Sequence, residues 1–208
     1  MSGRDGGARA AGAGGTAGVA GVLLTGGGSK RMGFDKSLMR VAGLPNAVRL
    51  AQVLGQVASP VVEVGPGRTD LPAAAERPQG SGPLAALAAG ATFLCRRGSR
   101  LPVVVVACDM PFLSATTLGF IAGYPGGLSV VPLVGGSLQP LCARWSQGDL
   151  QLAAELVEAG ERSMKALLGR ADFVALGPDR WPGWMVEDAF VDLDTPEDLE
   201  TWSLRRHW

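Results

Sequence analysis

Short apolar runs and stretches of helical periodicity alternate along the chain. The clearest run, Val103–Ala107, has no alternation of apolar and polar positions, which is typical of a strand covered on both faces. Val19–Leu24 and Val61–Val64 are similar runs bounded by glycine or proline, and we expect them to be buried strands as well. Strands of this kind belong mainly to parallel sheets with helices on both sides.

Helical patterns lie between these runs. The first follows Pro45 and has a broad apolar face of Val48, Leu50, Ala51, Val53, Leu54 and Val57. Further predicted helices are Pro83–Phe93, the segment from the cap Ser114 through Ile121, Asp149–Ala159, Ser163–Leu168, and Pro196–Leu204 capped by Thr195. Further strand candidates are Leu128–Leu133, Pro140–Trp145, Asp172–Leu176 and Phe190–Leu193, whereas Leu71–Gly82 is predicted to be loop. The alternation predicts an α/β domain with a mainly parallel sheet.

Composition sets the domain organisation. The 208 residues are 47% hydrophobic and 18% charged, which suits one domain with a substantial core. The first residues, Met1 to Thr16, are almost all Gly, Ala and Arg and offer nothing to bury. We therefore expect a flexible tail over residues 1–17 and a single domain over residues 18–208.

Charge and cysteine content exclude several classes of protein. Lys plus Arg and Asp plus Glu both number 19, so the balance gives no reason to expect a nucleic-acid or membrane binder. No apolar run reaches the roughly 20 residues of a membrane span. The three cysteines, Cys95, Cys108 and Cys142, lack metal or redox spacing, and such sparse thiols predict a reduced, cytoplasmic protein.

A glycine-rich loop follows the first predicted strand. Gly26, Gly27 and Gly28 allow the backbone to approach a ligand, and Lys30, Arg31 and Lys36 come soon after. Successive backbone N–H groups with basic side chains are suited to a triphosphate, although a mobile turn with a solvated basic rim explains the glycines equally well. Neither the phosphate loop of the P-loop NTPases nor the dinucleotide fingerprint is present.

The stretch LTGGGSKRMGFDKSL, residues 24–38, resembles the signature of sugar-nucleotide and molybdenum-cofactor nucleotidyltransferases. The resemblance implies a three-layer α/β/α Rossmann-like sandwich with a mainly parallel sheet and the nucleotide over the carboxyl ends of the strands. It also implies nucleotide contacts at Leu24, Thr25, Gly26 and Gly27, and phosphate contacts at Lys36 and Arg31. Thr25 stands where alanine is commonest in that family.

An aspartate follows the clearest strand. Asp109 lies just beyond Val103–Ala107, at the edge where open α/β sheets bind their ligands. A carboxylate there suits Mg²⁺, which takes one or two carboxylates together with substrate phosphates. A role in capping the turn before Pro111 explains Asp109 as well. The segment CDMPF at residues 108–112 resembles an element of molybdenum cofactor guanylyltransferases whose aspartate binds magnesium.

Three further segments resemble parts of the same enzymes. GPLAAL, residues 82–87, resembles an element that opens a helix near the nucleotide, and Glu76 stands where an aspartate usually contacts the nucleoside. Glutamate is one methylene longer than aspartate, and a solvated loop carboxylate explains Glu76 at least as well. QPLCARW, residues 139–145, resembles a strand on the pterin side, and FVDLDTPEDL, residues 190–199, resembles the closing element. Asp192 and Asp194 alternate there, either as a second carboxylate site near the metal or, for Asp194, as a helix cap.

The resemblance covers roughly residues 18–202 and implies one reaction. In it GMP passes from GTP to the phosphate of molybdenum-molybdopterin, and pyrophosphate is released. Lys36, Arg31 and Asp109 are the expected catalytic residues, Mg²⁺ is the expected cofactor, and proteins of molybdenum cofactor biosynthesis are the expected partners. Alternatives are a molybdopterin cytidylyltransferase, a sugar-phosphate or phospholactate nucleotidyltransferase, and a nucleotide-binding partner protein without catalysis.

Overall fold

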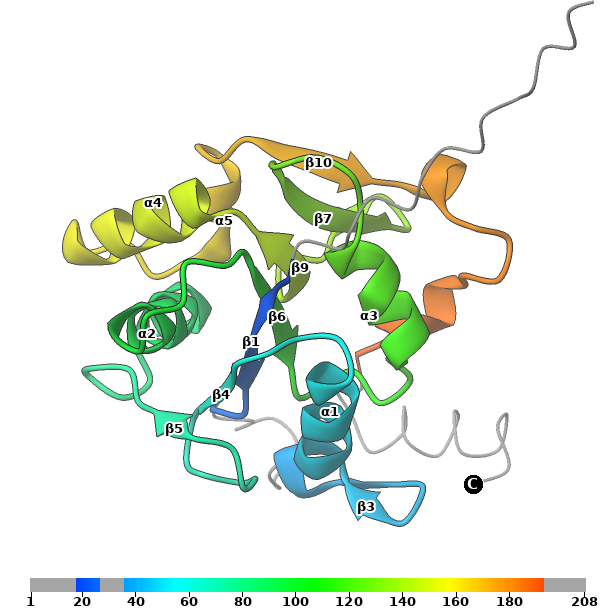
Figure 1. Cartoon of the computed structure of the whole chain (residues 1–208), viewed down its shortest axis with the longest axis horizontal. Helices are drawn as coiled ribbons and strands as arrows, with labels where there is room; N and C mark the ends of the chain where they lie inside the picture. The colour runs from blue at the N-terminus through cyan, green and yellow to red at the C-terminus, as the bar shows by residue number, and fades with distance from the viewer. Residues whose placement is uncertain (1–17, 27–35, 193–208) are drawn as a thin grey trace, which may run out of the picture.

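A mixed sheet runs through the part of the chain that this computed structural model describes, residues 18–26 and 36–192 (Figure 1). Its strand order is β10-β7-β9-β6-β1-β4-β5, and β8 pairs with β7 to complete eight strands. The strands are β1 (Ala20–Leu24), β4 (Val61–Val64), β5 (Ala73–Ala74), β6 (Val103–Ala107), β7 (Ser129–Val134), β8 (Ser137–Leu138), β9 (Cys142–Trp145) and β10 (Phe173–Leu176). A separate hairpin joins β2 (Arg40–Val41) and β3 (Leu44–Pro45).

The sheet is parallel around β1 and antiparallel around β9. In register, Leu24 of β1 lies opposite Val64 of β4 and opposite Ala107 of β6, and β5 continues the parallel set beside β4. β9 runs antiparallel to both β6 and β7, a reversal that the apolar pattern of Pro140–Trp145 did not indicate. Because β6, β1, β4 and β5 point the same way, the loops that follow them meet at one edge of the sheet.

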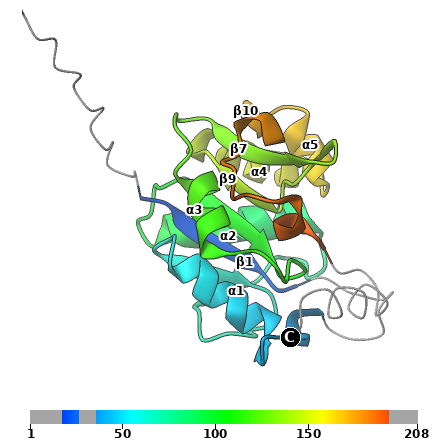
Figure 2. The same cartoon turned by 90° about the vertical axis from the view of Figure 1, so that its right-hand side faces the viewer.

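Helices cover both faces of the sheet. One face carries α2 (Pro83–Arg96), α4 (Gln147–Glu158) and α5 (Met164–Leu168), and their buried side chains form one core cluster with β1, β4 and β6. The other face carries α1 (Asn46–Gly55) and α3 (Ala115–Ala122), which form a second cluster with the opposite side of β1 and β6. Figure 2 shows α1 and α3 in front of the sheet. The predicted three-layer sandwich is confirmed.

The layers approach closely because small residues face the sheet. A Cβ atom at Gly90 of α2 would lie 2.8 Å from both methyl carbons of Val22. The central strands have the alternation that two covered faces require, with Val22 in one core cluster and Leu23 in the other. Both side chains are fully buried, and each such aliphatic side chain contributes about 1.5 to 3 kcal/mol through removal from water.

Several predicted elements differ in extent. β5 and β8 are two-residue strands inside segments without a strand prediction, and α2 runs three residues beyond Phe93. Ser114 caps α3 as predicted, since its Oγ accepts a hydrogen bond from the Thr117 N–H at 3.1 Å.

The segment after β10 differs most from its prediction. The strand expected at Phe190–Leu193 is wrong over its described residues, 190–192, because Phe190 ends a 3-10 helix, η3 (Glu187–Phe190). Its ring packs against Trp181 at a centroid distance of 5.6 Å and so contributes to the core under α3. The expected tail over residues 1–17 and the expected helix 196–204 lie outside the described residues.

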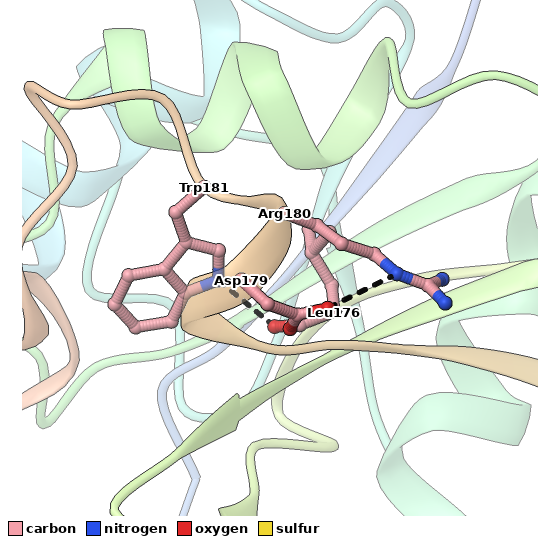
Figure 3. Close-up of polar contacts among 4 residues, drawn as sticks. All are labelled: Leu176, Asp179, Arg180 and Trp181. Atoms are coloured by element: carbon pink, nitrogen blue, oxygen red, sulfur yellow. Dashed lines mark hydrogen bonds and ion pairs between the residues drawn. The ribbon is translucent and has the colours of Figure 1, made fainter.

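A short 3-10 helix, η2 (Pro178–Arg180), leads from β10 into that segment (Figure 3). The Trp181 indole Nε1–H donates to the Leu176 carbonyl at 2.9 Å, which fixes the turn at the end of β10. Beside it, Arg180 Nε lies 3.7 Å from a carboxylate oxygen of Asp179, with both side chains more than half exposed. No helix in the described ranges is long and apolar enough to cross a membrane.

Candidate functional site

Four loops meet at the carboxyl edge of the parallel strands. In spatial order they follow β6, β1, β4 and β5, and they begin with Asp109, Thr25, Gly65 and Glu76 or their immediate neighbours. Three strand spacings separate the first loop from the last, about 14 Å. We refer to this set of loops as the site edge. Three of these loops carry the predicted nucleotide-binding and metal residues that the structure describes, which are Leu24, Thr25, Gly26, Glu76 and Asp109.

The loop after β1 is held against the end of β4. The N–H groups of Thr25 and Gly26 both donate to the Val64 carbonyl, at 3.0 and 3.3 Å. Leu24 and Thr25 are each 4% exposed, whereas Gly26 is exposed. Within the described residues, the surface that this loop offers to a ligand is therefore the backbone at Gly26.

The buried carboxylate of Glu63 on β4 holds the same loop through hydrogen bonds. Glu63 of β4 is fully buried and accepts a short hydrogen bond from the Thr25 hydroxyl. Its two oxygens also accept from the Arg68 N–H at 2.7 Å and from the N–H and hydroxyl of Thr69 at 2.9 and 2.7 Å. One side chain thus ties the loop after β1 to the loop after β4.

These contacts set the protonation state of Glu63. Burial raises the pKa of the carboxyl, but the hydrogen bonds from Thr25, Arg68 and Thr69 outweigh it, so the pKa lies below its ordinary value. Glu63 is therefore an internal anion that occupies a nest of N–H and hydroxyl donors.

Gly65 allows the two loops to touch. Its φ is +154°, and a Cβ atom there would lie 2.6 Å from the Gly26 nitrogen and closer still to the Thr25 hydroxyl. A side chain at this position would therefore push the loop after β1 away from β4.

The loop that carries Asp109 is anchored to the first turn of α1. The Asn46 side-chain amide, fully buried, donates to the Cys108 carbonyl at 2.8 Å. Arg49 donates from Nε to Asn46 Oδ1 at 3.0 Å, and its two terminal nitrogens donate to the carbonyls of Met110 and Leu113 at 3.0 and 2.9 Å. The backbone is thus held on both sides of Asp109.

The loop after β6 is also joined to the end of β1. The Cys108 N–H donates at 3.0 Å to the carbonyl of Leu24, the last residue of β1, so Asp109 lies one residue beyond a contact with the strand that leads into the glycine-rich loop. The Asp109 carboxylate also affects the pKa of a cysteine thiol on β9. Burial, and secondarily the Asp109 carboxylate, raise the pKa of the Cys142 thiol on β9 to about 12. Cys142 is therefore a neutral thiol under the Asp109 loop.

Glu76 lies at the far end of the site edge, beyond β5. Its Oε1 accepts from the Gly80 N–H at 2.7 Å and closes the turn that leads to α2. Its Oε2 is shielded from solvent and has no hydrogen-bond partner among the described residues.

Several predicted residues lie beyond what the structure describes. Lys36 begins the 3-10 helix η1 (Lys36–Leu38), which packs on α1, but its side chain lies outside the described part of the structure, as do Gly27, Arg31 and Asp194 entirely. Asp192 is described and exposed. The predicted phosphate contacts of Lys36 and Arg31 stay predictions.

Sequence reasoning missed Glu63, Asn46 and Arg49. A signal existed for Glu63, because an acidic residue in the otherwise apolar strand VVEV requires buried partners. No comparable signal marks Asn46 and Arg49, whose partners on the loop from residue 108 to residue 113 lie at least 61 residues away.

The donor set at the site edge fits magnesium. No group of three or more His, Cys, Asp or Glu side chains that would hold a metal occurs within residues 18–26 and 36–192. Asp109 is the carboxylate beside the glycine-rich loop, and Mg²⁺ commonly takes one or two protein carboxylates with the rest of its shell from waters and substrate phosphates.

Comparison with known proteins agrees with this architecture. A molybdenum cofactor guanylyltransferase of Rhodobacter capsulatus is 31% identical over 190 residues, which cover 87% of this chain and 93% of that protein. Among solved structures, molybdopterin-guanine dinucleotide biosynthesis protein A from Archaeoglobus fulgidus has a TM-score of 0.67 at 21% identity, covering 88% of this chain and 96% of that one. A Mycobacterium tuberculosis protein solved in complex with manganese has a TM-score of 0.54 at 17% identity, covering 92% and 97%.

The family model described as the MobA-like NTP transferase domain matches residues 21–174, from the first central strand to β10. This range contains all four loops of the site edge. The predicted resemblance to molybdenum-cofactor nucleotidyltransferases is confirmed, and the chain belongs to the MobA-like NTP transferase family.

Proposed function

We propose that this chain is a guanylyltransferase that transfers GMP from GTP to the phosphate of molybdenum-molybdopterin and releases pyrophosphate. The observation that carries the proposal is the register of β1 and β6, which sets the glycine-rich loop and Asp109 side by side at one edge. The extent of the match to the guanylyltransferase of Rhodobacter capsulatus supports the choice of reaction.

The nucleotide lies along the site edge in this proposal. Its phosphates face the loop after β1 and the Asp109 loop, and its nucleoside extends toward Glu76 beyond β5. The order of the loops supports this orientation. Asp109, a carboxylate suited to a metal ion, lies at one end of the site edge, and Glu76 Oε2, a hydrogen-bond acceptor, lies at the other. The Thr25 and Gly26 N–H groups already donate to Val64, so we assign the phosphates chiefly to Lys36, Arg31 and the later glycine-rich loop, with Leu24 to Gly27 along the nucleoside.

Asp109 is the residue that would hold Mg²⁺, the cofactor of the proposed reaction. When bound, the ion supplies neutralisation of charge on the phosphates of the nucleotide. The manganese complex of a protein with the same fold supports a divalent cation in general.

The residues of the chain position the substrates and supply positive charge. An oxygen of the acceptor phosphate attacks the α-phosphorus of GTP, a new P–O bond forms, and the bond to the β-phosphate oxygen breaks with its electron pair on the leaving pyrophosphate. The acceptor phosphate is ionised at neutral pH, so no side chain has to remove a proton and no covalent intermediate on the protein is needed. Lys36 and Arg31 stabilise the negative charge on the phosphates.

Glu76 is assigned to the nucleoside. Its shielded Oε2 has no hydrogen-bond partner among the described residues and can accept from a ribose hydroxyl or from a base N–H. Glu76→Gln keeps an oxygen for Gly80 but presents an NH₂ group to the ligand. We expect this variant to raise the KM for GTP more than it lowers kcat.

Pyrophosphate release tests the proposed function. The purified chain is offered GTP, CTP or a sugar phosphate with either triphosphate, in the presence of Mg²⁺, with and without molybdenum-molybdopterin. We expect release only with GTP and the molybdopterin acceptor together. Release with CTP identifies a cytidylyltransferase, release with the sugar phosphate identifies a sugar-nucleotide enzyme, and nucleotide binding without release identifies a non-catalytic partner protein.

The proposed reaction also implies partner proteins and a cellular location. The acceptor is delivered by proteins of molybdenum cofactor biosynthesis, which we propose as partners, and the reaction takes place in the cytoplasm. Co-purification of the tagged chain with molybdopterin-loaded proteins tests the proposed partners. The control is the same purification from a strain that lacks molybdopterin.

A further inference from the structure

Side chains of α1 hold the loop that carries Asp109. It begins at the end of β6 and ends at the cap of α3, and between these points its backbone carbonyls point toward α1. Three of those carbonyls, at Cys108, Met110 and Leu113, are satisfied by side chains of Asn46 and Arg49. The acceptors therefore include the residue before Asp109 and the residue after it.

We propose that Asn46 and Arg49 are positioning residues that set the metal affinity of Asp109. The inference rests on the proposed function, in which Asp109 holds the ion. Neither side chain is assigned to the substrate or the metal. Each acts by fixing the backbone from which the Asp109 carboxylate projects.

The geometry favours one rigid unit over two independent anchors. Arg49 Nε donates to Asn46 Oδ1 at 3.0 Å, which orients the Asn46 amide so that its NH₂ group faces the Cys108 carbonyl. The two terminal nitrogens of the planar Arg49 guanidinium then donate to two carbonyls of the loop, an arrangement that the single amine of a lysine cannot reproduce. The unit stands on the first turn of α1, whose Leu50 and Leu54 are fully buried against the sheet.

Outer residues of this type matter because a metal ligand must be held in place before the ion arrives. Loss of such a partner typically lowers metal affinity about ten- to a hundredfold. A looser Asp109 loop still contains the carboxylate, so the maximal rate at saturating metal should change less than the metal concentration needed to reach it.

Arg49→Lys and Asn46→Ala test the inference. The matched control is Arg144→Lys, because Arg144, which is buried, is likewise an arginine that donates to backbone carbonyls, but of residues 122–128 away from the site edge. Mn²⁺ binding to the protein alone is followed by the electron paramagnetic resonance signal of the free ion. In parallel, pyrophosphate release at saturating GTP and molybdopterin acceptor gives the Mg²⁺ concentration for half-maximal rate.

We expect both site variants to weaken Mn²⁺ binding and to raise the half-maximal Mg²⁺ concentration about ten- to a hundredfold. The KM for GTP at saturating Mg²⁺ should stay within about twofold of wild type. Arg144→Lys should lower the unfolding temperature and leave both metal constants unchanged. Unchanged metal constants in Arg49→Lys, or equal shifts in Arg144→Lys, would overturn the inference.

Failure of the proposed function has a different signature. It appears in the wild-type protein, as absence of pyrophosphate release from GTP and the molybdopterin acceptor. In that case the Mn²⁺ titration of the same variants still decides whether Asn46 and Arg49 set the metal affinity, because it needs no turnover. Asp109→Ala with wild-type Mn²⁺ binding would refute the metal assignment and this inference together.

Discussion

Two regions of the molecule each hold their loops with one arginine and one carboxylate, all buried except the half-buried Arg49. At the site edge, Glu63 and Arg49 hold the loops that follow β1, β4 and β6. In the antiparallel extension, which we define as β7, β9 and β10 with α3 and α4, Arg144 and Asp149 hold other loops. In each region one arginine donates to backbone carbonyls and one carboxylate gathers hydroxyl or N–H donors.

The antiparallel extension shows how much structure one arginine can fix. Arg144 of β9 is 6% exposed and donates four hydrogen bonds, at 2.6 to 3.0 Å, to carbonyls at the end of α3 and in the loop before β7. Burial lowers the pKa of its guanidinium, yet an arginine stays protonated at any physiological pH. Asp149 accepts from the hydroxyls of Ser129 and Ser146 and thereby joins β7 to the start of α4.

The difference lies in what the fixed loops carry. Those of the site edge present the Gly26 backbone and the Asp109 carboxylate, whereas those of the antiparallel extension only connect strands to helices. A buried arginine or carboxylate in this fold therefore indicates a fixed loop and does not by itself indicate chemistry. Two pairs of variants and two single variants test this comparison.

The largest effect is expected from the two aspartates. Asp109→Ala should lower kcat/KM for pyrophosphate release about a hundred- to a thousandfold, roughly 3 to 4 kcal/mol of transition-state stabilisation, because the proposed metal ligand is lost. Asp149→Ala should leave the activity per folded molecule unchanged and instead lower the free energy of unfolding, since the hydroxyls of Ser129 and Ser146 lose their acceptor. Equal activity losses in both variants would remove the distinction between the regions.

Two glycines provide the next contrast. Gly65→Ala should lower the free energy of unfolding by about 3 kcal/mol and raise the KM for GTP, because its Cβ meets the backbone of the loop after β1. Gly126→Ala, at φ +96° with nothing within 4 Å of the new atom, should lower it by about 1 kcal/mol through backbone strain and leave the KM unchanged. Urea unfolding and steady-state kinetics measure the two quantities.

Glu63→Gln should cost about 2 kcal/mol of stability. Each carboxylate oxygen accepts from a backbone N–H, so an amide NH₂ group faces a donor in either orientation. The folded pKa of Glu63 lies below its ordinary value of 4.5, so the unfolded chain binds the proton more readily.

The wild type should therefore lose stability as the pH falls from about 4.5 through the folded pKa, and the variant should lack this part of the slope. The contribution is fully present above that window. Chemical denaturation at several pH values measures it, and an identical pH slope in both proteins would contradict the role given to Glu63.

The smallest effect is expected at the surface. Arg180→Ala removes an ion pair with Asp179 whose side chains are more than half exposed (Figure 3), and it should change the free energy of unfolding by less than about 0.5 kcal/mol. Activity should be unchanged. A large loss of either would mean that exposed charge in the antiparallel extension matters as much as the buried charge of Arg144.

Much of the fold was predictable because its signals are local. Val61–Val64 and Val103–Ala107 form strands with the predicted bounds, since short and largely apolar runs between turn residues are typical of buried strands. Ser114 caps α3 for an equally local reason. Phe190 is the counterexample, because an apolar residue next to alternating aspartates looks like a strand, whereas packing against Trp181 decides its conformation.

By itself, the sequence determined the layer architecture, the glycine-rich loop with its family resemblance, and the position of Asp109 after a central strand. Tertiary structure decided which residues hold that site. Thr25 and Glu63 are 38 residues apart, and Arg49 and Met110 are 61 apart. The physical reason is that hydrogen bonds depend on distance and direction in space. A strand order such as β6-β1-β4 brings together residues that lie far apart along the chain, and the sequence between them does not indicate their contact.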